Sequence, residues 1–256
     1  MVATALSIAG SDPSGGAGLQ ADLKTFVDHG VYGMAVPTAL TVQNTLGVGR
    51  VHLLDPDLVQ EQVSAVLSDL EVGAIKVGML GSADTVEATA RALQGCSAPL
   101  VLDPVLRSSS GTDLLDSRGR ACLIEALLPR ATIWTPNGPE WELLAGGSEP
   151  SSWVEERGVA LLLTDGHGEG PDMVDRLFVP GHPPRTWRHP RQQSRNTHGT
   201  GCTLSASIAA RLAQGEPLAE AARGAVAYVA GLLLSSRSHT LGEGTGPLLH
   251  GLKDGR

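Results

Sequence analysis

One glycine-rich segment, THGTGC at residues 197–202, carries residue types that could do chemistry. Gly199, Thr200 and Gly201 leave backbone N–H groups open if a helix begins there, and the positive end of the helix dipole would lie at the same place. These N–H groups would form an anion hole for charge that develops on a transferring phosphate. The same field would lower the pKa of the Cys202 thiol and make it more reactive.

Cys202 also has two other interpretations. Most free cysteines are small core residues, and Cys202 could be such a buried filler. It could instead be the nucleophile of a thiol hydrolase, with His198 as its base. Sequence neighbours at a helix start rarely face each other, which disfavours the hydrolase.

A second segment, TPNGPE at residues 135–140, sets Asn137 and Glu140 three residues apart at an expected helix start. One interpretation is a capping box, in which each side chain satisfies a backbone N–H group of the other residue. The other is a magnesium site, because amide and carboxylate oxygens at a strand end could hold Mg²⁺ through water. Asp103 in VLDPV lies at another expected strand end and could join such a site or serve as a turn residue.

A third segment, GSDPSGGAGLQADLK at residues 10–24, is a glycine-rich loop between an expected strand and an expected helix. Its glycines permit positive φ and let a ligand approach the backbone closely. The segment matches neither the P-loop nor the dinucleotide-binding motif. A plain structural turn explains it equally well, and Asp22 could be a solvated acid in the first helical turn.

The elements that must position these segments alternate along the chain in the manner of βαβ units, which predicts an α/β fold with a mostly parallel sheet covered on both faces. Strands are expected at residues 4–9, 34–42, 74–79, 99–105, 132–137 and 159–165. Helices are expected at residues 18–30, 55–70, 82–95, 117–129, 199–214 and 217–235, and an antiparallel hairpin at 172–189. Ligands bind beyond the carboxyl ends of such strands, where the three segments lie.

Composition and charge exclude several functional classes. The 256 residues carry a net charge of −8 and the pI is near 5.4, which argues against nucleic acid or an anionic membrane as a partner. The Arg-rich residues 185–195 are a local exception. Three cysteines without metal-ligand spacing fit a reducing cytoplasm. Residues 1–10 resemble a first strand and no signal peptide, and the longest apolar run, residues 225–234, is too short to span a bilayer, so we expect a soluble protein.

These segments, together with VYGMAVPTALTVQNTLGV, IKVGML and NTHGTGCTLSASIAA, resemble the hydroxymethylpyrimidine and phosphomethylpyrimidine kinases of thiamine biosynthesis, which belong to the ribokinase-like superfamily. The segments follow the family's order from residue 4 to about residue 235. The resemblance implies a three-layer α/β/α fold with a small antiparallel hairpin, in one domain over residues 1–256. It also implies ATP- and Mg²⁺-dependent phosphorylation of 4-amino-5-hydroxymethyl-2-methylpyrimidine and of its monophosphate.

The resemblance implies roles for the catalytic and pyrimidine-binding positions. Cys202 stands where most ribokinase-like enzymes have an Asp base, and residues 199–201 would hold the transferring γ-phosphoryl group. A Cys202 thiolate would orient or deprotonate the substrate hydroxyl, for which its pKa must fall below its reference value. The pyrimidine would lie near Ala17, Asp22, Gln43 and Met79. Asp22 and Gln43 would form hydrogen bonds with the aminopyrimidine edge.

The resemblance also implies the metal and nucleotide positions. Asn137 and Glu140 would bind Mg²⁺ and phosphate, with Asp103 beside them. ATP would contact Thr164, Gly166 and Thr197.

Two segments depart from the family pattern and remove positive charge. Thr164 and Asp165 stand where the family has Lys and Gly, and Ser109 stands where it commonly has another Lys. Arg107 could compensate, since a guanidinium binds phosphate well. Each charge-assisted contact is typically worth about 1.5–3 kcal/mol, so we expect weaker nucleotide binding or slower transfer.

Two other functions stay open at this point. A pyridoxal- or pyridoxine-type kinase is one, although Gln43 in VQNT favours the thiamine pyrimidine. A catalytically weakened pyrimidine-binding protein is the other, and the intact NxxE and GTGC motifs oppose it. The family is often homodimeric, and Trp141 or Trp153 at the surface could belong to an interface. The segment between Trp141 and Val159 is short for the family, as if a helix were trimmed or lost.

Overall fold

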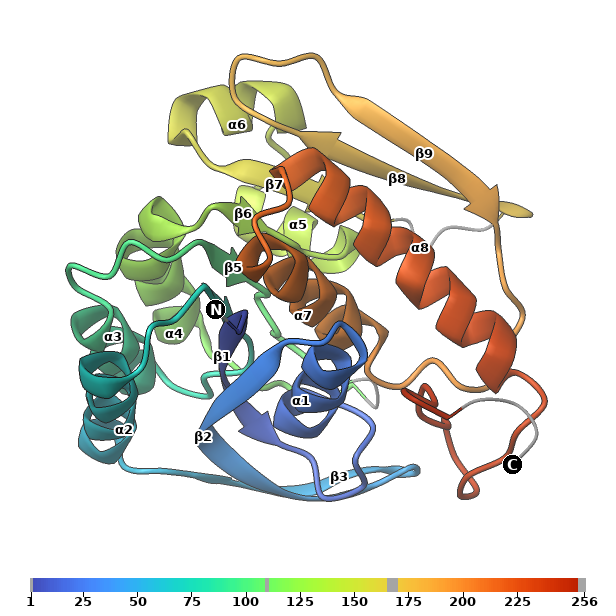
Figure 1. Ribbon diagram of the computed structural model, residues 1–256, viewed down its shortest axis with the longest axis horizontal. Coiled ribbons are helices and arrows are strands. Elements are labelled where there is room, and N and C mark those ends of the chain that lie inside the picture. Colours follow the sequence, from blue (N-terminus) through green and yellow to red (C-terminus); the bar gives the residue numbers. More distant parts are fainter. Residues whose placement is uncertain (1, 109–110, 165–169, 253–256) are drawn as a thin grey trace.

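The computed structural model describes residues 2–108, 111–164 and 170–252, which form one continuous nine-stranded sheet (Figure 1). The strand order is β3-β2-β1-β4-β5-β6-β7-β8-β9. The strands are β1 (Thr4–Ser11), β2 (Tyr32–Asn44), β3 (Gly47–Leu53), β4 (Ala74–Val77), β5 (Leu100–Leu102), β6 (Ile133–Trp134), β7 (Ala160–Leu163), β8 (Asp172–Phe178) and β9 (Arg185–Pro190). The six central strands β2, β1, β4, β5, β6 and β7 pair in parallel. At one edge β3 pairs antiparallel with β2, and at the other the antiparallel β8–β9 hairpin pairs antiparallel with β7.

Helices cover both faces of the sheet (Figure 1). They are α1 (Gly18–Asp28), α2 (Pro56–Asp69), α3 (Ala83–Ala92), α4 (Ser117–Cys122), α5 (Gly138–Ala145), α6 (Pro150–Arg157), α7 (Thr200–Ala213) and α8 (Leu218–Ser236). A π-helical turn (Leu123–Leu127) and a 3₁₀ turn (Leu128–Arg130) continue α4. Side-chain caps explain several helix starts, for example Asp55 at α2 and Ser82 at α3.

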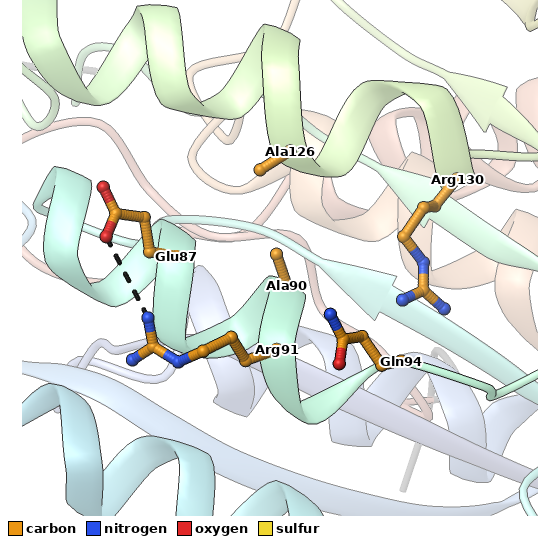
Figure 2. A pocket seen from close by; sticks show the side chains of 6 residues that line it. All are labelled: Glu87, Ala90, Arg91, Gln94, Ala126 and Arg130. Carbon is orange, nitrogen blue, oxygen red and sulfur yellow. Dashed lines mark ion pairs between the residues drawn. The ribbon is translucent and has the colours of Figure 1, made fainter.

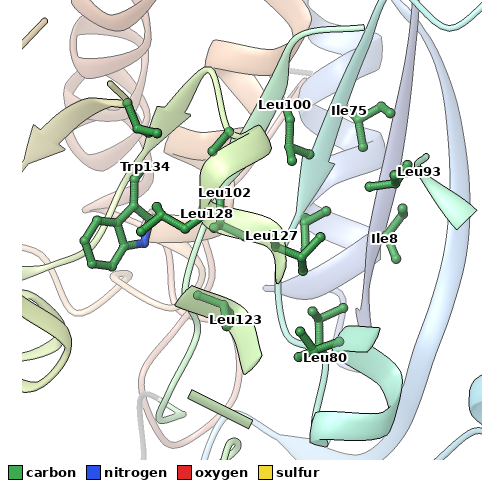
Figure 3. Packing of buried hydrophobic residues seen from close by; sticks show 14 of the residues in the cluster. Ile8, Ile75, Leu80, Leu93, Leu100, Leu102, Leu123, Leu127, Leu128 and Trp134 are labelled. Carbon is green, nitrogen blue, oxygen red and sulfur yellow. The ribbon is translucent and has the colours of Figure 1, made fainter. Parts of the chain in front are cut away.

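Two hydrophobic clusters lie on opposite faces of the sheet, because successive strand residues point to opposite sides. On β5, Leu100 and Leu102 belong to the first cluster and Val101 to the second. The first cluster is covered by α2, α3, the π-helical turn, α5 and α6. Figure 3 shows part of its packing, with Ile8 and Ile75 of the sheet and Leu123 and Leu127 of the π-helical turn. The second is covered by α1, α7 and α8. The structure therefore has three layers, α/β/α, as the sequence predicts.

The sequence-based predictions of strands are confirmed in place, and so is the antiparallel hairpin. Two elements were not predicted, the edge strand β3 and the helix α6. The segment after Trp141, expected to have a trimmed or lost helix, contains the end of α5 and the eight-residue helix α6. α8 is long and apolar enough to cross a membrane by length and composition alone, but it packs on α7 within the second cluster.

The expectation that Trp141 and Trp153 lie at the surface is also wrong. Both are buried, and they pack around Trp134 with ring centroids 4.9–5.9 Å apart. Burial of large aromatic surface stabilises the first core cluster, which explains why these rings turn inward. These two residues are therefore not available to an interface.

Candidate active site

The loops that follow the parallel strands meet at the start of α7. Ser205 on α7 donates a hydrogen bond to Asp103 after β5, at 2.9 Å. On the other side, a Cβ atom added to Gly199 would overlap the carbonyl oxygen of Gly16 in the glycine-rich loop after β1. The fold thus brings together segments that are more than 180 residues apart in sequence.

The start of α7 is open, as an anion hole requires. Gly199 is its N-cap with φ 82°, a left-handed conformation that favours glycine, and no side chain caps the helix. Gly201 is exposed, and a Cβ atom added there would meet no atom within 4 Å. Thr200 beside it is half-buried. The first N–H groups of a helix have no intrahelical partner, so this end can receive an anion.

Cys202 is half-buried in the first turn of α7, close to several ionisable groups. Burial raises the pKa of its thiol to about 12; the Lys76 charge and an N–H group of Gly18 oppose this shift, and the charges of Asp22 and Asp103 add to it. The expectation that the helix field lowers this pKa is therefore wrong. Its physical reason is that desolvation and two carboxylates outweigh the nearby positive charges.

A buried ion pair lies beneath this thiol. Lys76 on β4 and Asp22 on α1 are both fully buried, and the Lys76 Nζ atom lies 2.9 and 3.1 Å from the two Asp22 carboxylate oxygens. Burial alone would lower the pKa of Lys76, but the charges of Asp22, Cys202 and Asp103 raise it above its ordinary value. Lys76 is therefore a permanent cation inside the site.

This geometry changes the interpretation of Asp22. Its carboxylate accepts hydrogen bonds from Lys76 and from the Ser7 hydroxyl and has no exposed surface. The expected direct hydrogen bond from Asp22 to a pyrimidine does not fit this arrangement, because no oxygen of Asp22 faces a space that a ligand could enter. Lys76 itself was not singled out from the sequence. Its signal was present, since a lysine inside the apolar strand AIKV must be paired when it is buried.

Asn137 and Glu140 form the predicted capping box at the start of α5. The Asn137 Oδ1 atom accepts from the Glu140 N–H at 2.9 Å, and the Glu140 Oε2 atom accepts from the Asn137 N–H at 3.0 Å. The second carboxylate oxygen of Glu140 accepts from the Leu106 N–H at 3.2 Å. Burial and the negative charge of Asp103 raise the pKa of Glu140 to about 7.

The negative charge of Asp103 acts on the Glu140 carboxylate, so the two groups lie close enough to interact electrostatically. Among the residues that the structure describes, no group of three or more His, Cys, Asp or Glu side chains could hold a metal. Mg²⁺ at phosphate-transfer sites is usually held by one or two carboxylates and by phosphate oxygens. Burial and the charge of Asp22 raise the pKa of Asp103, and the charge of Asp103 helps to raise the pKa of Glu140, so a cation at this place would relieve repulsion between carboxylates.

Three of the expected pyrimidine-binding residues, Ala17, Met79 and Gln43, lie in the glycine-rich loop or near it. Ala17 is the N-cap of α1, and its N–H donates to Asp12 at 2.9 Å. Met79 is buried against Gly10. The side-chain amide of Gln43, at the end of β2, lies 3.2 Å from the His198 ring.

The expected nucleotide positions are only partly described. Thr164 follows β7 and forms a parallel bridge with Asn137. Thr197 is exposed just before the anion hole. Gly166, Asp165 and Ser109 lie outside the described residues.

A family model described as phosphomethylpyrimidine kinase matches residues 12–249 of the chain. The chain belongs to the phosphomethylpyrimidine kinase family. The hydroxymethylpyrimidine/phosphomethylpyrimidine kinase of Rhizobium meliloti is 44% identical over 98% of this chain and 97% of its own length. The thiamine biosynthesis bifunctional protein ThiED of Geobacter sulfurreducens is 42% identical over 96% of this chain and 51% of its own length.

Solved structures agree with this membership of the phosphomethylpyrimidine kinase family. The phosphomethylpyrimidine kinase of Clostridium difficile 630 is 36% identical, with a TM-score of 0.78, over 90% of this chain and 99% of that chain. The pyridoxal kinase of Staphylococcus aureus in complex with ADP is 30% identical, with a TM-score of 0.87, over 98% of this chain and 94% of that chain. The chain is thus a kinase, an enzyme that transfers phosphoryl groups.

The structure also shows the surroundings of Arg107, the residue expected to compensate for a missing lysine. Arg107 does not replace a missing lysine in the structure, because its side chain is 66% exposed and pairs with Asp113 at 2.6 Å. Among the described residues, Lys76 is a fully buried cation whose charge acts on the Cys202 thiol.

A surface hollow elsewhere in this kinase is not part of the site. It lies between α3 and the π-helical and 3₁₀ turns that follow α4 (Figure 2). Its lining residues are Glu87, Ala90, Arg91, Gln94, Ala126 and Arg130. They lie on a helical face of the molecule, and they include none of the residues discussed above.

Proposed function

We propose that this enzyme transfers the γ-phosphoryl group of ATP to the hydroxymethyl group of 4-amino-5-hydroxymethyl-2-methylpyrimidine, and then a second one to the resulting monophosphate, in thiamine biosynthesis. The observation that carries the proposal is the open start of α7 at Gly199, with Cys202 in its first turn and the glycine-rich loop against it. Membership of the phosphomethylpyrimidine kinase family supports the same reaction.

The chain's own groups would act mainly by position and charge. Phosphoryl transfer passes through a loose transition state whose charge is spread over the phosphoryl oxygens, so the enzyme has little covalent work to do. N–H groups at the start of α7 would hold those oxygens, and the buried Lys76 would add positive charge below them.

Cys202 would act in this reaction as a thiol. Its raised pKa leaves it protonated near neutral pH. We therefore propose that Cys202 orients the substrate hydroxyl toward the phosphoryl group. The new P–O bond forms as the bond from the γ-phosphorus to ADP breaks, and the hydroxyl proton passes to an oxygen of the transferred phosphoryl group. This role does not require Cys202 to be a thiolate before the substrate binds.

The metal and nucleotide proposals depend on the same strand ends. Asp103 and Glu140, with Asn137 beside them, would hold Mg²⁺, which when bound neutralises phosphate charge. The raised pKa of Glu140 supports this, because the site favours added positive charge. Thr164, Gly166 and Thr197 would line the path of the ATP phosphates. With few cations there, we expect weaker ATP binding than in a family member that keeps both lysines.

One experiment tests the reaction and its alternatives. The purified protein is incubated with ATP, Mg²⁺ and, separately, the aminopyrimidine alcohol, its monophosphate, pyridoxal or pyridoxine, and ADP and products are followed by mass spectrometry. We expect ADP and phosphorylated product with the first two. Turnover only on pyridoxal would favour a pyridoxal kinase, an alternative that the similarity to pyridoxal kinase structures keeps relevant. Tight pyrimidine binding without ADP release would indicate a weakened binding protein.

We further propose that the chain acts as one kinase domain in the cytoplasm and forms a homodimer. The antiparallel edge supports the dimer, because apolar side chains are exposed along it at Leu40, Val42 and Leu46. Sedimentation velocity would measure the mass, and Leu46→Glu would yield monomers if this edge is the contact.

A further inference from the structure

A closed ring of hydrogen bonds joins the glycine-rich loop, β2 and the loop before α7. The His198 Nε2 atom lies 2.8 Å from the Asp12 Oδ2 atom and 3.2 Å from the Gln43 Nε2 atom. The Gln43 Oε1 atom lies 3.1 Å from the Thr41 Oγ1 atom. The Thr41 hydroxyl donates to the Ser11 carbonyl oxygen at 3.0 Å, which closes the ring next to Asp12.

The hydrogen bonds that Asp12 accepts determine whether the Nε2 atom of His198 carries a proton. Asp12 accepts from the N–H and hydroxyl of Ser14 and from the N–H groups of Gly16 and Ala17. Burial opposes ionisation, but hydrogen bonds from His198 and Ser14 lower the pKa of Asp12 below its ordinary value. An ionised carboxylate only accepts, so the Nε2 atom of His198 must carry a proton and donate it.

That proton fixes the Gln43 amide. The Gln43 nitrogen facing a protonated His198 Nε2 atom sets two donors against each other. A 180° turn of the amide, which exchanges its nitrogen and oxygen, removes this conflict and places the oxygen beside His198. The amide nitrogen then lies beside Thr41, whose single hydroxyl proton is already given to Ser11 and whose oxygen can accept. In this orientation the His198 Nε2–H group is shared between Asp12, at 2.8 Å, and the Gln43 oxygen, at 3.2 Å, and no two donors face each other.

The His198 ring is also held by contact with glycines. A Cβ atom added to Gly16 would collide with the ring, and one added to Gly199 would collide with the Gly16 backbone. His198 is buried between these loops. The ring therefore cannot shift without moving the glycine-rich loop or the anion hole.

We propose that His198 and Thr41 are positioning residues that hold the Gln43 amide in one orientation, and that this orientation selects a ring with an amino group next to a ring nitrogen. The inference rests on the proposed function, since it takes the site to bind a pyrimidine alcohol. After the ring of hydrogen bonds is complete, Gln43 keeps one N–H donor and one oxygen lone pair. An amide of fixed orientation pairs with such a donor–acceptor edge at two points, as glutamine does with adenine.

This orientation separates two ligand classes. A 4-aminopyrimidine presents an N–H donor and an acceptor nitrogen side by side. Pyridoxal-type rings carry no amino group beside their ring nitrogen, so they cannot form both bonds. Asp12 acts through His198 and the loop N–H groups and contacts no substrate in this proposal.

The test compares two pyrimidine alcohols that differ only in the 4-amino group. The kcat and KM values of each are measured for the wild type, for His198→Phe and for Thr41→Val. We expect the preference for the amino-bearing alcohol to fall about tenfold in both variants, mainly through KM, because one ligand hydrogen bond is worth roughly that factor. His189→Phe is the matched control, since His189 forms a similar pair with Asp175 at 2.9 Å on the β8–β9 hairpin, and it should keep the wild-type preference.

Two outcomes would overturn the inference. An equal loss on both alcohols in His198→Phe and Thr41→Val would mean that these residues only support the fold, and an unchanged preference would mean that Gln43 does not depend on them. If His198→Phe does not fold, Thr41→Val decides the question from the other end of the ring.

Nitrogen NMR of His198 adds a measurement that needs no substrate. We expect a protonated Nε2 atom, and an unprotonated one would overturn the ring of hydrogen bonds itself. A wild type that phosphorylates neither alcohol would contradict the proposed function, whereas a protonated Nε2 atom would still support the ring. The two failures are thus distinguishable.

Discussion

Two ion pairs near the strand ends differ sharply in their surroundings. Lys76 on β4 and Asp22 on α1 are fully buried, and Asp22 accepts a further hydrogen bond from Ser7. Arg107 and Asp113, in the loop after β5, approach more closely at 2.6 Å but keep 66% and 68% of their side chains exposed. Water screens the second pair and not the first, so distance alone does not rank them.

The comparison separates the two halves of the candidate site. On the side of the pyrimidine, charged and polar groups are buried and paired before any ligand binds, as in Lys76–Asp22 and Asp12–His198. On the side of the nucleotide, the described residues offer a half-buried Thr164 and an exposed arginine. We infer that the pyrimidine side of the site is preorganised, and that the nucleotide side becomes organised only when ATP and metal bind.

Lys76→Met should lower the free energy of unfolding by about 3–5 kcal/mol, because it leaves the Asp22 carboxylate buried without a partner. The double variant Lys76→Met/Asp22→Asn should recover most of this loss, since no buried charge remains. Its kcat should stay low, because the cation beneath the anion hole is still absent. Urea unfolding and steady-state kinetics measure both effects, and a single variant that loses less than about 1 kcal/mol would contradict the prediction.

Cys202→Ala should reduce kcat by about 10²-fold, because the group that orients the substrate hydroxyl is lost. Cys202→Ser should lose less, since a hydroxyl can still hydrogen-bond. Cys122→Ala serves as the matched control, because Cys122 is another half-buried free thiol, on α4. Turnover near the wild-type value in both Cys202 variants would rule out the role.

Glu140→Gln should raise stability at pH 8 by about 1–3 kcal/mol. The pKa of Glu140 is about 7 in the folded protein against an ordinary value of 4.5. The native state therefore binds more protons than the unfolded state between these values, and the stability of the wild type falls as pH rises through that window. Glutamine keeps the capping bond but does not ionise. The difference in unfolding free energy between the two proteins should vanish near pH 4.5, and a difference independent of pH would contradict this origin.

Arg107→Ala should change stability by less than about 1 kcal/mol, because the pair it breaks is exposed. The KM for ATP should also stay within about twofold of the wild type if the guanidinium does not reach the phosphates. Thermal unfolding and ATP titration measure these values. A large rise in the KM for ATP would instead show that Arg107 contacts the nucleotide. The nucleotide side of the site would then also have a charged group in place before ATP binds.

Much of the fold could be predicted because its signals are local. The strands of the parallel sheet are short apolar runs, and the helices carry caps at their first residues, as Asp55 and Ser82 do. The edge strand β3 was missed because GVGRVHL is largely exposed and offers no clear alternation. Trp141 and Trp153 were misplaced because sequence does not tell which face of a short helix meets the core.

The site was predictable to a different degree at each residue. The capping box of Asn137 and Glu140 depends on neighbours three residues apart, and it is confirmed. The pKa of Cys202 depends on Asp22 and Asp103, which are distant in sequence, and its predicted direction was wrong. Lys76 was overlooked because its partner lies 54 residues away.

The sequence by itself determined the α/β class, the family and the positions of the glycine-rich loop and the anion hole, because backbone geometry and helix starts are encoded within a few residues. Only the tertiary structure decided how the charges are held. Desolvation and through-space contact placed Lys76 under Cys202, removed Asp22 from the ligand and tied His198 to Asp12 and Gln43. These effects depend on burial and distance, which no local stretch of sequence contains.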